Sequence, residues 1–94
     1  LLTEAFMYRY APQTARILEL VRSGALGEIQ TIQATFSFRA GFDPEKRLFN
    51  NALGGGGILD VGGYPVSFAR LVAGAAERRA FSNPLEVKGS ASLN

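Results

Sequence analysis

Glycine dominates one short stretch of the chain and limits what that stretch can fold into. Residues 54–57 are four consecutive glycines, and residues 62–65 read Gly-Gly-Tyr-Pro. Glycine adopts backbone angles that other residues avoid and weakens the interior of a helix or strand, and the residue before a proline is pushed away from helical geometry. We therefore expect a flexible or tight turn at the four glycines, a helix that begins over 58–61, and an interruption or kink of that helix at 62–65.

Two main helices are predicted on either side of this stretch. Pro12 is favoured at the first position of a helix, and the apolar residues of 13–23 recur three and four positions apart. Gly24 then has the place of a left-handed cap. A second helix, apolar nearly all round, is predicted over 65–73 and should end at Gly74.

Strands are predicted over 3–9, 32–38 and 85–93. In 32–38, apolar residues alternate with polar ones, which is typical of a half-buried antiparallel strand. Ile29 falls out of this register, so we expect a bulge or a late strand start near Gln30. The predicted fold class is α+β, a partial, mostly antiparallel open sheet with two main helices, with a loop over 40–53 that holds a short helical turn at its Asp-Pro pair.

Composition excludes several kinds of chemistry. The 94 residues include no cysteine and no histidine, and the net charge is +2. Disulfides, thiolate metal sites and imidazole catalysis are excluded, so an acid or base must be Asp, Glu, Lys or Tyr, and we expect no metal. Scattered basic residues do not favour nucleic-acid binding, and no apolar run approaches the roughly 20 residues of a membrane span. We expect a cytoplasmic protein, with which the lack of cysteine is compatible.

Asp60 and Tyr64 are the sharpest candidates for chemistry. On a continuous helix, residues four apart share a face, so a carboxylate and a phenol could act on one substrate hydroxyl. The alternative, favoured by spacing alone, is a helix-end aspartate and a partly buried core tyrosine. The glycines of 54–57 suggest a phosphate loop only weakly, because no Gly-Lys-Ser/Thr follows them. Arg9 and Arg47 are candidates for binding anionic groups, although a structural role is more common for each alone.

Four segments taken together resemble one enzyme family. They are Glu4–Gln13 (EAFMYRYAPQ), Val21–Ile29 (VRSGALGEI), Arg47–Phe49 (RLF) and Gly55–Tyr64 (GGGILDVGGY). In this order they are similar to the glucose–fructose oxidoreductase, inositol dehydrogenase and MocA family (Gfo/Idh/MocA). The last segment is the most specific of the four.

The resemblance implies a two-domain enzyme with a Rossmann domain for NAD or NADP. Residues 1–10 would be the last strand of that domain. Residues 11–94 would be the first part of the C-terminal α/β domain, which binds substrate and forms a homo-oligomer through its sheet. Both ends of the chain are expected to lie inside a longer protein.

The resemblance also implies roles for single residues. Tyr64 takes the general acid/base position, where many members carry histidine, and Asp60 matches the aspartate that hydrogen-bonds the reacting hydroxyl of a sugar, cyclic polyol or diol. Arg9 matches an arginine near the site in diol dehydrogenase-like members, and Arg47 lies in the substrate loop. Three glycines are expected near substrate or cofactor: Gly55, Gly56 and Gly57.

A tyrosine base needs help from elsewhere in the protein. A free phenol has a pKa of about 10, so a nearby cation is required, and the family supplies a lysine from a Glu-Lys-Pro motif that these 94 residues do not contain. The isolated chain is therefore expected to be catalytically inert. The alternatives are a non-catalytic interaction module and a sugar-binding protein of the same fold.

Overall fold

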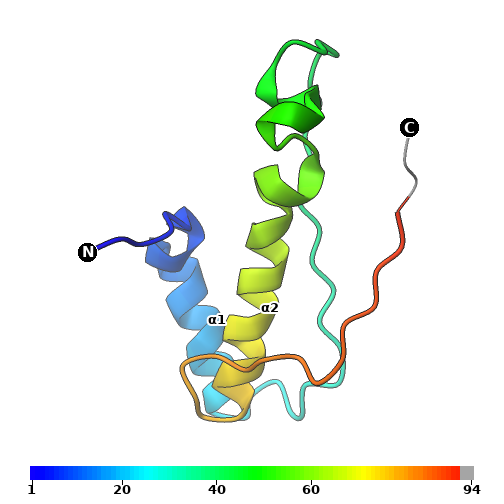
Figure 1. The fold of residues 1–94 in the computed structure, drawn as a ribbon. Helices are drawn as coiled ribbons and strands as arrows, with labels where there is room; N and C mark the ends of the chain where they lie inside the picture. Colours follow the sequence, from blue (N-terminus) through cyan, green and yellow to red (C-terminus); the bar gives the residue numbers. More distant parts are fainter. Residues whose placement is uncertain (92–94) are drawn as a thin grey trace.

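The computed structural model describes residues 1–91 and is built around two parallel helices. These are α1 (Pro12–Arg22) and α2 (Gly63–Ala76), which run side by side in the same direction to the lower end of the molecule (Figure 1). The radius of gyration is 16.0 Å, against about 12 Å for a compact domain of this length. Among the described residues, no helix combines the length and hydropathy needed to cross a membrane.

Both ends of α1 follow the prediction. Pro12 occupies the first turn, where its missing N–H leaves no hydrogen bond unmade. At the other end Gly24 has a φ of 76°, its amide donates to the carbonyl of Val21 at 3.1 Å, and the amide of Ala25 donates to Leu20 at 3.1 Å. These two bonds form a Schellman motif, so the predicted glycine cap is confirmed.

The core between the helices is small. Val21 of α1 meets Val72 and Ala75 of α2, and each of the three is at most 6% exposed. Burying one valine side chain stabilises a fold by about 1.5–3 kcal/mol. Partly buried side chains complete the cluster: Ile17, Leu18, Ile29, Ile32 and Phe68.

Short helical turns occupy much of the remaining chain. A 3₁₀ turn, η1 (Met7–Tyr10), precedes α1, and two others, η2 (Arg47–Phe49) and η3 (Asn51–Leu53), precede the glycines. A π-helical turn, η4 (Ile58–Gly62), leads directly into α2. The helical start predicted over 58–61 is thus present in the wider, π form.

The second helix is longer than predicted at both ends. Gly62 and Gly63 keep helical backbone angles, so the chain changes from π to α geometry there without a break. Pro65 is accommodated in the first turn of α2, where prolines are tolerated. Gly74 does not end the helix, which continues to Ala76 and closes with Arg78 in the left-handed region at a φ of 59°.

The predicted α+β fold is wrong for the part of the chain that the structure describes, which contains helices and no strand. Residues 3–6 have no regular structure and residues 7–9 belong to η1 instead, because Phe6 and Tyr8 pack against Tyr64 and Phe68 of α2. Residues 28–42 and 84–91 are extended, yet none of their backbone groups forms a backbone hydrogen bond within residues 1–91.

The physical reason is that a strand requires a ladder with a neighbour. Alternation over 32–38 specifies an extended backbone with one face toward α2, but it does not supply the partner. Without a ladder among residues 1–91, there is neither a bulge nor a strand start at Gln30. The remainder of the predicted strand 85–93, residues 92–94, lies outside the described residues.

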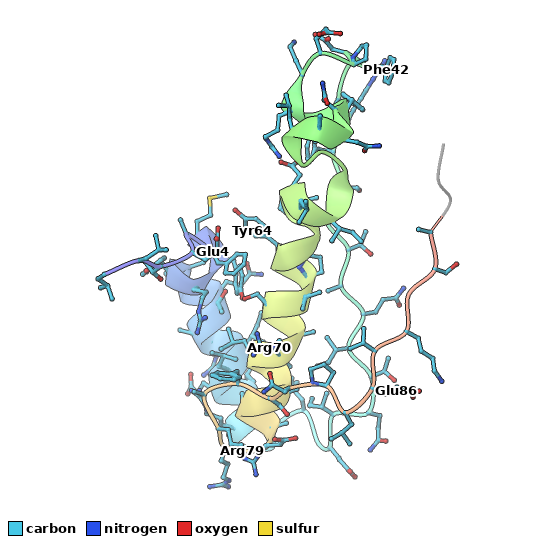
Figure 2. The ribbon with its side chains drawn as sticks, viewed as in Figure 1. Glu4, Phe42, Tyr64, Arg70, Arg79 and Glu86 are labelled. Carbon is cyan, nitrogen blue, oxygen red and sulfur yellow. The ribbon has the colours of Figure 1, made fainter. Side chains whose placement is uncertain are left out.

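The connector that follows α2, residues 77–83, is held against the helix by contacts with Arg70. The guanidinium carbon of Arg70 lies 4.8 Å from the ring centre of Phe81, and its Nη2 donates to Asn83 Oδ1 at 2.7 Å. The carbonyl of Arg70 accepts the Ser82 amide at 3.0 Å. Figure 2 shows Arg70 beside the turn that crosses the lower end of α2. Gly74 makes this crossing possible, because a Cβ there would lie 2.6 Å from backbone atoms of Phe81.

We expect Gly74→Ala to lower the free energy of unfolding by about 1–3 kcal/mol, because the added methyl group overlaps the Phe81 backbone. Gly89→Ala is the matched control, since a Cβ at Gly89 meets nothing within 4 Å. Urea unfolding followed by circular dichroism compares the two variants. Equal midpoints would contradict the close packing of Phe81 on α2.

Candidate functional site

The glycine run is folded back onto the two short helices before it. Gly54 caps η3 in the left-handed region with a φ of 71°, and Gly56 has a φ of 101°. A Cβ at Gly55 would lie 2.6 Å from the carbonyl oxygen of Arg47 and 2.8 Å from that of Asn50. At these three positions glycine is therefore required by backbone geometry.

The amides of three of these four glycines are already engaged within the chain. Gly54 donates to Asn51 at 3.1 Å and Gly55 donates to Asn50 at 3.0 Å. Gly56 donates to the carbonyl of Leu48 at 2.9 Å. A phosphate loop needs amides that point at the anion. The tight-turn interpretation of the glycines therefore fits the structure better than the phosphate-loop interpretation.

Asp60 and Arg47 form an ion pair. Arg47 Nη2, in η2, donates to Asp60 Oδ1 at 2.5 Å, and the Asp60 side chain is 18% exposed, compared with 55% for Arg47. Such a pair at a surface adds at most about 1 kcal/mol to stability. Its effect here is to fix the direction of the Asp60 carboxylate, which lines an open hollow of about 520 Å³ together with Gly56 and Gly57.

Tyr64 lies at the start of α2 among aromatic rings. The ring of Phe6 meets it edge-on at 5.1 Å between centroids, with the planes at 81°, and Phe36 meets it at 5.2 Å and 87°. The edge-to-face arrangement is the favoured geometry for aromatic pairs. Tyr64 lines a second open hollow of about 650 Å³, walled largely by aromatic and apolar side chains from η1, residues 33–36 and α2.

The two hollows are neighbours, and Phe36 lines both of them. Asp60 and Tyr64 are therefore placed on either side of one phenylalanine instead of facing a single cavity. Arg9 is exposed on η1 and lines neither hollow. Gly55 lies against the backbone of Arg47 and Asn50, and it also lines neither hollow. The structure thus brings together Arg47, Asp60 and two of the three predicted glycines, with Tyr64 adjacent.

Phe36 and Tyr8 were missed as site residues by the sequence analysis. The alternation over 32–38 puts Phe36 on the face shared with Ile32, which indicates burial but not a position beside Tyr64. The strand predicted over 3–9 did not indicate on which side of the chain the Tyr8 phenol lies. A larger hollow of about 670 Å³ lies at the other end of the helices and contains none of the predicted site residues.

Comparison with known proteins identifies the family. Residues 14–89 match the model of the GFO/IDH/MocA C-terminal domain. The chain belongs to this family. No solved structure matches the chain.

Several relatives of this GFO/IDH/MocA chain carry names that describe a reaction. D-xylose 1-dehydrogenase (NADP(+)) 2 from Haloferax volcanii is 44% identical over 82% of this chain and 23% of its own length. Trans-1,2-dihydrobenzene-1,2-diol dehydrogenase from Mus musculus is 34% identical over 79% of the chain and 22% of its own length. An uncharacterized oxidoreductase, ORF334, from Rhizobium meliloti is 38% identical over 84% and 23%. The chain spans less than a quarter of the length of each of these relatives.

We expect Gly55→Ala to disrupt the loop that carries Arg47, because the new Cβ would overlap backbone atoms of Arg47 and Asn50. Gly57→Ala is the matched control, since Gly57 has helical angles (φ −64°, ψ −30°) and open space around it. Amide hydrogen exchange over residues 47–60 reports the difference. Faster exchange is expected in Gly55→Ala alone, and equal exchange in both variants would contradict the close approach.

Proposed function

We propose that this chain is the substrate-side part of an NAD(P)-dependent oxidoreductase that transfers hydride between a nicotinamide and a hydroxyl of a sugar, cyclic polyol or diol. The observation that carries the proposal is the position of Tyr64 at an open, aromatic-walled hollow directly beside the hollow of Asp60. Membership of the GFO/IDH/MocA family supports it. So do the names of two relatives, a xylose dehydrogenase with NADP and a diol dehydrogenase.

The chain would contribute the proton-handling half of the reaction. Oxidation of an alcohol needs a base that takes the hydroxyl proton, and reduction needs the same group to return it. Tyr64 is proposed for this role in a chain without histidine. Asp60 would accept a hydrogen bond from the substrate, with its carboxylate held in direction by Arg47. Arg9 remains a predicted support of the site.

The amides of residues 54–56 already donate within the chain and therefore do not form a phosphate loop. We therefore propose that residues outside this chain bind NAD or NADP. When bound, the cofactor would supply the ring that accepts or gives the hydride. Gly56 and Gly57 would lie on the substrate side of that site, where they leave open space beside Asp60.

The wider organisation is proposed on the same basis. Residues 1–10 would close the Rossmann domain, and residues 11–94 would begin the substrate domain, which agrees with a family match that starts at residue 14. A homo-oligomeric state and a cytoplasmic location stay predictions. An isolated 94-residue chain should show no turnover with either nicotinamide cofactor.

Replacing Tyr64 by Phe in the full-length protein tests the function. The substitution keeps the ring and removes the proton-transferring hydroxyl, so we expect kcat to fall about 10²–10⁴-fold, the usual contribution of a general acid or base, with a smaller change in KM. Turnover of D-xylose and of a trans-dihydrodiol, followed through the nicotinamide absorbance, provides the measurement. Asp60→Asn should lower kcat as well, because it removes the charge and keeps the shape.

Tyr10→Phe is the matched control, because Tyr10 is 84% exposed and lines neither hollow. It should leave kcat unchanged. Unchanged turnover in Tyr64→Phe would remove this tyrosine from the mechanism. A full-length protein that binds sugar without oxidising it would instead support the alternative, a non-catalytic sugar-binding or interaction module of the same family.

A further inference from the structure

A hydrogen bond between two hydroxyl groups joins η1 to α2. The Oη of Tyr8 lies 2.7 Å from the Oγ of Ser67, and the pair is partly buried although 59 residues separate the two in sequence. Neither residue belongs to the proton-transfer roles assigned above. The bond links the segment before α1 to the first turns of the helix that carries Tyr64.

Tyr8 is itself firmly held. Its carbonyl oxygen accepts the Oγ1 hydroxyl of Thr14 at 2.7 Å, and Thr14 is only 6% exposed. The ring of Tyr8 meets that of Phe68 at 5.6 Å and 78°, a T-shaped contact. Tyr8 is therefore tied to α1 through its backbone and to α2 through its side chain.

Ser67 is well placed to transmit this constraint to Tyr64. Residues three apart on a helix lie on the same face, and Ser67 follows Tyr64 by three positions within α2. The ring of Tyr8 lies 6.4 Å from that of Tyr64, and Phe6, two residues before Tyr8, meets Tyr64 edge-on. A shift of η1 against α2 would therefore move the rings that set the direction of the Tyr64 phenol.

We propose that Tyr8 is a positioning residue for Tyr64, acting through its hydroxyl bond to Ser67. The bond fixes the rotation of the first turns of α2 relative to η1, and with it the place of the Tyr64 ring between those of Phe6 and Phe36. The proposal rests on the proposed function, in which Tyr64 is the acid/base. Positioning of this kind acts on the transition state and so on kcat, with little effect on substrate binding.

A double-mutant cycle in the full-length protein tests the bond. Tyr8→Phe and Ser67→Ala each remove one hydroxyl and keep the packing, and each should lower kcat about threefold to tenfold, the size of one neutral hydrogen bond, with KM unchanged. The double variant should lose no more than either single one, because both remove the same interaction. Ser67→Thr restores a hydroxyl and should recover most of the lost kcat. Tyr10→Phe again serves as the control.

The possible results separate the two proposals. Normal kcat in Tyr8→Phe and Ser67→Ala, while Tyr64→Phe loses turnover, would overturn the positioning role and leave the function intact. Losses that multiply in the double variant would overturn it too, because the hydroxyls would then act independently. A lower melting temperature with unchanged kcat would identify a purely structural bond and overturn it as well. Full turnover in Tyr64→Phe would overturn both proposals together.

Discussion

The contact of Val21 with Val72 and Ala75 is the constraint on which the rest of the structure depends. It sets α2 parallel to α1, and α2 in turn carries Tyr64 at its start and Arg70, which holds the following connector, at its middle. Few other apolar side chains are buried in residues 1–91. A small core of this kind means that modest changes of packing between the helices are passed on to the site.

The aromatic rings extend this arrangement from the core to the site. Phe68 contacts the core cluster on one side and the ring of Tyr8 on the other. Tyr8 and Phe6 then reach Tyr64. The path from the helix–helix contact to the proposed acid/base is thus an uninterrupted series of side-chain contacts, which explains how a segment outside both helices can influence the direction of one phenol.

Local features of the fold could be predicted from the sequence, and long-range ones could not. The start of α1 at Pro12 and its end at Gly24 depend on a few neighbouring residues, and the structure confirms both. The predicted strands failed because alternation over 32–38 describes one extended segment, whereas a ladder depends on a second one that residues 1–91 do not provide. Gly74 was taken for a helix end because its partner, the Phe81 backbone, is seen only in three dimensions.

The same distinction between local and long-range features holds for the candidate site. Asp60 and Tyr64 were identified because they lie four residues apart in a recognisable segment. The pairing of Arg47 with Asp60 spans 13 residues of irregular chain, and no spacing rule covers such a loop. Likewise, Phe36 lies beside Tyr64 because an unpaired extended segment passes the start of α2, which the pattern of apolar residues alone does not specify.

The π-helical turn at Ile58–Gly62 has a consequence for how the site tolerates changes of chain length. A π turn holds more residues than an α turn, so this segment contains one residue more than a regular α-helix would use for the same turn. Deleting one residue there would allow α geometry to run on without a break. A deletion between Asp60 and Tyr64 would also change the angle between these two side chains about the helix axis, and Arg47, which precedes the deletion, would move together with Asp60. The alignment of the two halves of the site thus depends on one surplus residue, a property of chain length that no side-chain substitution can reproduce.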